Sequence, residues 1–234
     1  MKKPTLYVLA TPIGNLQDIS PRAIETLKTV DVVLCEDTRV TQKLLQSFGL
    51  KKTVLSYHHH SEELKVKEIL DLLREQKSLA LVSDAGTPGI SDPGGKLIQE
   101  VVRVFGVDVV ISPIPGPNAI VAALSISGFP ADAFSYLGFP PHKKGRKTFF
   151  SSAGNIETTF VYFESTHRIM KSLDELAFVI GTRPIVVCRE LTKLYETIYR
   201  GTVSDIKFQL EKTSVKGEFA VVVGPLSFAQ KMLK

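Results

Sequence analysis

The chain has 234 residues, of which 44% are hydrophobic and 23% are charged, an ordinary composition for a globular protein that can bury a core. Its apolar stretches reach only about five or six residues, far short of the roughly 20 that span a bilayer, which argues against a membrane protein. No apolar segment follows the Met-Lys-Lys start, so we expect a cytoplasmic protein without a secretory signal. Cys35 and Cys188 are too few for a disulfide framework, and we expect both to be reduced, half-buried thiols.

The net charge of +5 and the isoelectric point near 9.1 suit a polyanionic partner such as RNA. Five basic or histidine side chains cluster between His142 and Lys147, directly after a Gly-Phe-Pro-Pro segment that predicts an exposed loop. Such a cluster can contact phosphates with salt-dependent affinity, but an ordinary solvated charge run accounts for it equally well.

Apolar runs of strand length alternate with helix-like segments through the first half of the chain, which predicts a parallel sheet buried on both faces. Ser20 before Pro21 and Ser61 before two glutamates indicate helix starts, while Gly49 and Gly106 indicate helix ends. The predicted strands cover residues 6–10, 32–35, 54–57, 79–82 and 107–111.

Pro113, Pro115 and Pro117 then interrupt the alternation, and we place the domain boundary here, giving domains 1–113 and 114–234. The second half predicts a smaller mixed sheet, so the expected fold class is two α/β domains with a cofactor cleft between them. Its predicted strands are residues 134–137, 160–163, 185–188, 197–200 and 219–223, and its predicted helices are residues 118–125, 168–179 and 204–210.

Residues 83–94, Ser-Asp-Ala-Gly-Thr-Pro-Gly-Ile-Ser-Asp-Pro-Gly, follow a predicted strand, where small ligands bind in open α/β sheets. The glycines permit close approach of a ligand to the backbone, the prolines stiffen the turn and the aspartates supply polar groups. A tight structural turn is the alternative, but a segment of this length with two carboxylates favours a cofactor cradle. The residues behind this argument are Gly86, Gly89, Gly94, Pro88, Pro93, Asp84 and Asp92.

Several common catalytic patterns are missing. Thr11-Pro12-Ile13-Gly14-Asn15 after the first strand lacks the glycine spacing of a dinucleotide site, and no phosphate-binding P-loop occurs. Ser91 lacks the closing glycine of a hydrolase nucleophile elbow, because Pro93 takes its place. Three adjacent histidines, residues 58–60, cannot face one ion from a strand or helix, so we predict no metal site.

Charged residues follow the strands at the edge where the glycine-rich loop lies. Glu36-Asp37-Thr38-Arg39 can supply a base and a substrate clamp, or form an exposed turn with a local ion pair. In the second half, Glu164 and Glu190 also follow strands, where each serves equally well as a cleft residue, a helix cap or an ion-pair partner. Residues 216–218 before the last strand are consistent with a simple hairpin turn.

Taken together and in order, six segments resemble the ribosomal RNA 2′-O-ribose methyltransferase branch of the tetrapyrrole methylase superfamily. The twelve-residue glycine-rich loop and the Glu-Asp-Thr-Arg motif are the specific part of the resemblance, which extends from about Leu6 to Gly224. The six segments are residues 11–16, 36–39, 83–94, 115–119, 189–193 and 216–218.

The resemblance implies that S-adenosylmethionine is held in the cleft between the domains, that the protein is a homodimer, and that it methylates a cytidine ribose in the decoding region of small-subunit ribosomal RNA, as naked RNA or as an assembled 30S subunit. The implied cofactor contacts are Pro12, Gly14, Asp84, Gly86, Thr87, Pro88, Ile90, Ser91, Asn118, Ala119, Phe163 and Glu164. The candidate bases are Asp37 and Glu36, then Glu190, and the candidate RNA contacts are Arg39, Lys143, Lys144, Arg146, Lys147 and Lys193.

Two departures from the family pattern matter. The chain ends about ten residues after Gly224, where many relatives continue, and Thr166 stands where the family usually has proline, which predicts a different local turn. Two other functions stay open at this point, namely methylation of a tetrapyrrole carbon and a non-catalytic role in RNA binding or assembly.

Overall fold

A computed structural model describes residues 3–58 and 63–231 of the chain. The chain folds as two compact units, Met1–Asn118 and Ala119–Lys234. The boundary that we predicted after Pro113 lies inside the strand Val110–Ile114, which the proline run does not interrupt. Pro113 fits there because the strand is at the edge of its sheet, where one side of the backbone needs no ladder donor.

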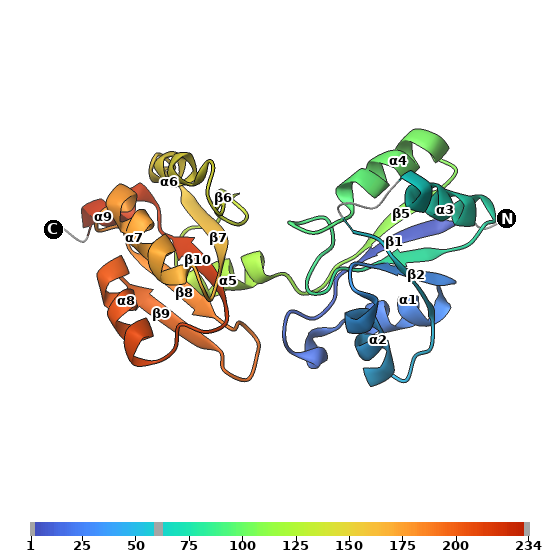
Figure 1. Cartoon of the computed structure of the whole chain (residues 1–234), viewed down its shortest axis with the longest axis horizontal. Helices are drawn as coiled ribbons and strands as arrows, with labels where there is room; N and C mark the ends of the chain where they lie inside the picture. The colour runs from blue at the N-terminus through green and yellow to red at the C-terminus, as the bar shows by residue number, and fades with distance from the viewer. Residues whose placement is uncertain (1–2, 59–62, 232–234) are drawn as a thin grey trace. The chain divides into compact units, whose positions relative to one another are not determined.

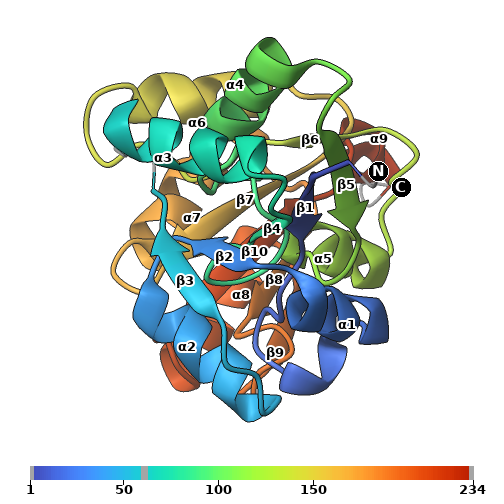
Figure 2. The same cartoon turned by 90° about the vertical axis from the view of Figure 1, so that its right-hand side faces the viewer.

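The first unit forms an α/β structure whose five strands are all parallel, in the order β3-β2-β4-β1-β5. Figures 1 and 2 show α1 and α2 on one face of this sheet and α3 and α4 on the other, so the predicted burial of both faces is confirmed. The elements are β1 (Thr5–Leu9), η1 (Leu16–Asp18), α1 (Pro21–Thr29), β2 (Val32–Cys35), α2 (Thr38–Ser47), β3 (Thr53–Ser56), α3 (Glu63–Arg74), β4 (Leu79–Leu81), α4 (Gly95–Phe105) and β5 (Val110–Ile114).

Helix boundaries in this unit follow the local signals. Ser20 accepts a hydrogen bond from the N–H of Ala23 at the start of α1, and Gly49 and Gly106 adopt positive φ angles of 66° and 52° after α2 and α4. The start predicted at Ser61 lies outside the described residues. The predicted fifth strand was wrong by three residues at its start, because Val107 still belongs to the turn that follows Gly106 and is 81% exposed.

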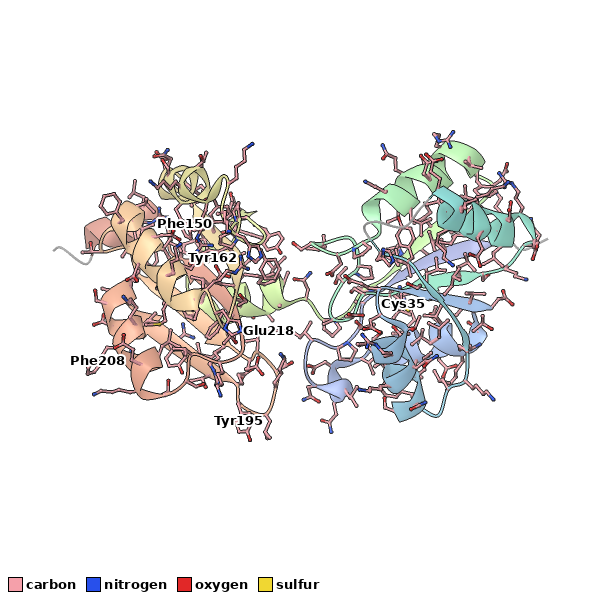
Figure 3. All side chains as sticks on the ribbon, in the orientation of Figure 1. Cys35, Phe150, Tyr162, Tyr195, Phe208 and Glu218 are labelled. Carbon is pink, nitrogen blue, oxygen red and sulfur yellow. The ribbon has the colours of Figure 1, made fainter. Side chains whose placement is uncertain are left out.

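The second unit contains a mixed sheet, as predicted, in the order β6-β7-β10-β8-β9, where β6 and β7 are parallel and the other pairs antiparallel. Helix α5 packs on one face, and α6, α7 and α8 pack on the other around Phe150 and Tyr162 (Figure 3). The elements are α5 (Ala119–Ser127), β6 (Phe134–Tyr136), α6 (Arg146–Gly154), β7 (Thr159–Ser165), α7 (Ile169–Ile180), β8 (Ile185–Arg189), β9 (Thr197–Gly201), α8 (Val203–Lys212), β10 (Glu218–Val223) and α9 (Leu226–Lys231).

The two cysteines are free and fully buried, with exposures of 0% for Cys35 and 1% for Cys188, rather than half-buried as we predicted. Each thiol is buried because helices cover the sheet face to which its side chain points. Burial raises the pKa of Cys35, and it raises the pKa of Cys188 to about 12. Both thiols therefore stay protonated at neutral pH and are poor nucleophiles.

None of the helices in residues 3–58 and 63–231 has the length and apolar composition that a bilayer span requires.

A buried arginine holds three backbone segments of the second unit together. Arg183 is 1% exposed and donates hydrogen bonds to the carbonyl oxygens of Ile156, Thr158 and Gly224 at 2.6 to 3.2 Å. We expect Arg183→Met to lower the free energy of unfolding by about 3 kcal/mol, because the buried carbonyl oxygen of Gly224 and two partly buried carbonyl oxygens would lose their donor. Urea denaturation of both proteins measures the change.

Arg200→Met is the matched control for this substitution. Arg200 also donates to carbonyl oxygens, those of Ile126 and Ser127, but it is exposed, so water can replace it. We expect a loss below about 1 kcal/mol for this control. Equal losses in the two variants would show that burial of Arg183 is not what makes it important.

Candidate active site

The carboxyl ends of the parallel strands bring four predicted segments of the first unit to one edge of the sheet. They are residues 11–15 after β1, 36–39 after β2, 83–94 after β4 and 115–118 after β5. In an open parallel sheet this edge is the ordinary place for a small ligand. The structure thus brings together the candidate residues of the first unit.

Gly86 joins the segment after β1 to the segment after β4. The N–H of Thr11 donates to the carbonyl oxygen of Gly86 at 2.9 Å, and the N–H of Gly86 donates back to Thr11 at 3.1 Å. The Thr11 hydroxyl, which is buried, donates to the carbonyl oxygen of Ser83 at 3.1 Å. Our site prediction had omitted Thr11, although a threonine directly after a buried strand is a signal for such a bond.

The segment after β5 closes against the same glycine. The Thr87 hydroxyl donates to the carbonyl oxygen of Pro117 at 3.2 Å. Gly86 has a φ angle of +82°, and a Cβ atom there would lie 3.3 Å from Cγ2 of Ile13 and 3.8 Å from the carbonyl oxygen of Pro117. Both the angle and the close approach require glycine at this position.

The glycine-rich loop has a buried floor and an exposed rim. Ser83, Gly86 and Pro88 are buried, whereas Asp84, Gly89, Ile90 and Ser91 are exposed. Ser91 is held at a φ of +65°, which is unfavourable for a residue with a side chain, and such strain is concentrated at functional sites. The rim offers backbone groups, one carboxylate and the apolar Ile90, a combination that suits a ligand with polar and apolar parts.

Asp37 is the N-cap of α2 and is fully engaged in that role. Its carboxylate accepts hydrogen bonds from the backbone N–H of Arg39 at 2.8 Å and from the Arg39 side chain, where Oδ2 and Nη2 are 2.6 Å apart. These bonds lower the pKa of Asp37 to about 2. A carboxylate with so low a pKa is a weak proton acceptor, which argues for a positioning role.

Asp84 lies beside this cap, and its pKa is shifted in the opposite direction to that of Asp37. Its Oδ1 accepts a hydrogen bond from the N–H of Asp37 at 3.1 Å. Partial desolvation raises the pKa of the Asp84 carboxyl, and the Asp37 charge raises it further, although the hydrogen bond opposes both effects. The two neighbouring carboxyl groups thus have pKa values that are displaced in opposite directions, a pattern common in acid–base sites.

Four charged residues predicted in the second unit, Glu164, Arg146, Glu190 and Lys193, are engaged in ion pairs. The Glu164 side chain is 0% exposed, with Oε1 at 2.9 Å from Nε of Arg168 and Oε2 at 3.5 Å from Nη1 of Arg146. Phe163 packs edge-on against Tyr136, with ring centroids 5.3 Å apart. Glu164 therefore organises its own unit, and only its backbone or remaining acceptor capacity is left for a ligand.

The structure corrects the prediction for Arg146. We expected it in an exposed loop with the neighbouring lysines, but it is the first residue of α6 and is 4% exposed. Its guanidinium contacts Glu164, bonds the carboxylate of Glu175 at 2.6 Å and donates to the carbonyl oxygen of Pro141. A cation so placed cannot contact RNA phosphates, whereas Lys143, Lys144 and Lys147 are exposed.

Glu190 and Lys193 form a second ion-pair cluster in this unit. Lys193 Nζ lies 3.1 Å from Oε1 of Glu190 and 2.9 Å from Oε2 of Glu218. Burial by itself would raise the pKa of Glu190, but the N–H of Glu218 and the ammonium of Lys193 hold it below its ordinary value. Gly217 is required here, since a Cβ atom would lie 2.7 Å from Cγ of Glu190.

Fold and site together define an α/β protein with a glycine-rich sheet edge that suits a small ligand and with a second, mixed-sheet unit. Its sequence matches the family described as Tetrapyrrole (Corrin/Porphyrin) Methylases over residues 5–207. The chain belongs to this family.

Curated relatives match over nearly the whole chain. One from Thermotoga maritima is 43% identical over 218 residues, covering 93% of this chain and 97% of the relative. One from Halalkalibacterium halodurans is 44% identical over 222 residues, covering 94% of this chain and 76% of the relative. Both relatives are named ribosomal RNA small subunit methyltransferase I.

Solved structures share the fold at lower identity. A cobalamin biosynthetic enzyme, cobalt precorrin-4 methyltransferase, is 24% identical with a TM-score of 0.66 and covers 94% of each chain. Uroporphyrin-III C-methyltransferase from Thermus thermophilus is 17% identical with a TM-score of 0.62 and covers 99% of each chain. These similarities confirm the predicted α/β fold of the tetrapyrrole methylase type.

Proposed function

We propose that this chain transfers a methyl group from S-adenosylmethionine to the 2′-hydroxyl of a cytidine ribose in the decoding region of small-subunit ribosomal RNA. The observation that carries the proposal is the 43% identity over 97% of a relative named ribosomal RNA small subunit methyltransferase I. The glycine-rich sheet edge supports it, because that edge suits a small cofactor. We further propose that the enzyme acts as a cytoplasmic homodimer.

The residues around Gly86 fit S-adenosylmethionine. The closely joined turns at residues 11–14, 83–91 and 117–118 include the exposed residues Gly14 and Gly89, whose backbone groups can contact the polar groups of the cofactor. Ile90, which is 43% exposed, provides apolar area for the adenosyl group, and Asp84 provides a negative charge opposite a sulfonium. We propose that the predicted residues of these turns hold the cofactor.

The chemistry that S-adenosylmethionine supplies when bound is an activated methyl group that needs no acid for its release. The protein must orient the ribose hydroxyl and accept its proton. Asp37, Glu36 and Glu190 were the candidate bases, but Asp37 and Glu190 have lowered pKa values and fixed ion-pair partners. We propose that Asp84 accepts the proton at a carboxylate oxygen, and that Asp37 positions Arg39 and the start of α2.

Two substitutions separate Asp84 from Asp37. We expect Asp84→Asn to lower kcat by a factor of about 10² to 10⁴, the usual contribution of a general base, and to abolish the acidic limb of the pH profile. The midpoint of that limb should lie above the ordinary pKa of an aspartate, because partial burial raises the pKa of Asp84. Asp37→Asn should leave kcat within about tenfold, since asparagine also caps helices.

Methyl transfer measured from pH 4 to 9 tests both variants, with calorimetry as a check that they bind S-adenosylmethionine. Loss of turnover in Asp37→Asn with retained activity in Asp84→Asn would show that Asp37, and not Asp84, accepts the proton.

Exposed lysines just before α6 and in its first turn are the proposed phosphate contacts. Replacing Lys143, Lys144 and Lys147 together by glutamine should lower the slope of log affinity against log salt by about 2, since each phosphate contact on single-stranded RNA adds about 0.7. Filter binding at several salt concentrations measures the slope. A triple glutamine variant of Lys65, Lys67 and Lys77, also positively charged but on and after α3, is the control, and equal slopes for both variants would exclude this loop.

Transfer of radiolabelled methyl from S-adenosylmethionine tests the proposed function. The acceptors are unmodified small ribosomal subunits, naked small-subunit RNA and a porphyrinogen, each with the labelled position mapped afterwards. Label on a cytidine ribose supports the proposal and shows which assembly state is recognised. Label on the porphyrinogen alone would identify a tetrapyrrole methyltransferase, and label on no acceptor would favour a non-catalytic RNA-binding or assembly protein.

A further inference from the structure

The loop between β8 and β9 presents two large apolar side chains to solvent. Leu194 is 88% exposed, and the adjacent Tyr195 is 69% exposed. Figure 3 shows Tyr195 at the end of this loop, pointing away from the sheet of the second unit. Single exposed apolar residues are common, but an adjacent pair at the tip of one loop calls for an explanation.

The backbone of this loop is held in an unfavourable conformation. Glu190 and Thr192 have φ angles of +52° and +65°, the left-handed region that residues with side chains rarely adopt. Thr192 is β-branched, which makes its angle a true outlier. Strain of this kind persists only where surrounding contacts impose it, and it is typical of binding and catalytic segments.

Those contacts fix both sides of the tip. Arg189 donates to the carbonyl oxygen of Tyr195 at 3.0 Å and to that of Lys216 at 2.6 Å. The N–H of Thr192 donates to the Glu196 carboxylate at 2.6 Å. The Lys193 pair with Glu190 closes the loop at its base. The loop is therefore preorganised, so that a partner of Leu194 and Tyr195 would pay little ordering entropy.

The size and charge of the tip indicate what it contacts. A stable protein interface buries more than about 1,000 Å², far more than two side chains provide. An aromatic ring beside an aliphatic side chain instead matches one or two unstacked nucleotide bases, which RNA-binding proteins stack on such rings. Near the tip, Lys193 is paired with Glu190 and Glu218, so the tip itself adds little phosphate attraction.

We propose that Leu194 and Tyr195 form a base-stacking tip that contacts an unpaired nucleotide of the RNA substrate. The proposal rests on the proposed function, since it assigns part of RNA recognition to this loop. Stacking is insensitive to salt, in contrast to the phosphate contacts of Lys143, Lys144 and Lys147.

Binding of naked small-subunit RNA to the full chain tests the tip. Tyr195→Ala should weaken binding by about 5- to 150-fold, the range found for loss of one stacked base, with an unchanged salt slope. Tyr195→Phe keeps the ring and should bind within about twofold of the wild type. Phe178→Ala removes another aromatic ring, 94% exposed on α7, and should also bind as the wild type does.

The outcomes separate this proposal from the proposed function. If Tyr195→Ala transfers methyl groups and binds RNA as the wild type does, the proposed stacking role of the tip is wrong and the proposed function still stands. A changed oligomeric state of Tyr195→Ala in sedimentation would overturn it too, since the tip would then belong to a protein interface. Absence of binding by the wild type to both naked small-subunit RNA and the assembled small subunit would overturn both proposals. Unchanged affinity of Tyr195→Ala for S-adenosylmethionine is expected if only RNA contact is lost.

Discussion

Gly86→Val is expected to abolish binding of S-adenosylmethionine. Valine would have to adopt a φ of +82°, and its Cβ would lie 3.3 Å from Cγ2 of Ile13 before its methyl groups are counted. A β-branched residue is a genuine outlier at such an angle, so the bonds between Gly86 and Thr11 would break or shift. We expect affinity to fall at least about 100-fold, or roughly 2.7 kcal/mol, by calorimetry.

Gly49→Val separates loss of the site from simple backbone strain. Gly49 has a similar φ of +66° after α2, but a Cβ atom there meets nothing within 4 Å. This variant should lose stability and keep its affinity for S-adenosylmethionine. Gly86→Ala serves if the valine variant does not fold. Normal affinity in a folded Gly86 variant would move the cofactor away from the glycine-rich loop.

The strands were predictable because burial on both faces leaves a simple signal. Val32–Cys35 is apolar at every position and was predicted at its observed limits. The prediction failed at β5, where the apolar Val107 follows a helix-ending glycine and the strand itself contains a serine and a proline. An edge strand tolerates both, so local hydrophobicity misplaces its start.

The site was predictable as a set of loops, and the roles of its side chains were not. The motif Glu-Asp-Thr-Arg identifies two carboxylates, but only the structure shows that Asp37 caps α2 and binds Arg39. It also shows that Asp84, 47 positions further along the chain, completes this corner. Partners so far apart leave no periodic pattern, and the protonation behaviour of a carboxyl depends on them.

Thr166 illustrates how a departure from a family pattern is accommodated. Its hydroxyl oxygen accepts a hydrogen bond from the N–H of Gly217 at 2.7 Å and lies 2.8 Å from the carbonyl oxygen of the same residue. Proline has no such group. The threonine thus ties the end of β7 to the turn before β10, which the sequence suggested only as a locally different turn.

A large loss of stability is also expected when the buried ion-pair cluster around Arg146 is broken. Arg146→Met is expected to lower the free energy of unfolding by about 3 kcal/mol, because Glu164 would keep only one of its two cationic partners in a fully buried position. Arg103→Met breaks an exposed pair with Glu100 on α4 and should cost less than about 0.5 kcal/mol. Urea denaturation of both variants provides the comparison.

The same variant decides between the structural role of Arg146 and the RNA contact that its position beside three lysines had suggested. Arg146→Met should leave the salt slope of RNA binding unchanged, since a guanidinium that is 4% exposed cannot displace counterions from phosphates. Lys147→Met, one position further along α6 and exposed, should lower that slope by about 0.7. A lower slope for Arg146→Met at full stability would contradict the buried ion pair, because only a side chain that leaves Glu164 and Glu175 could reach the RNA.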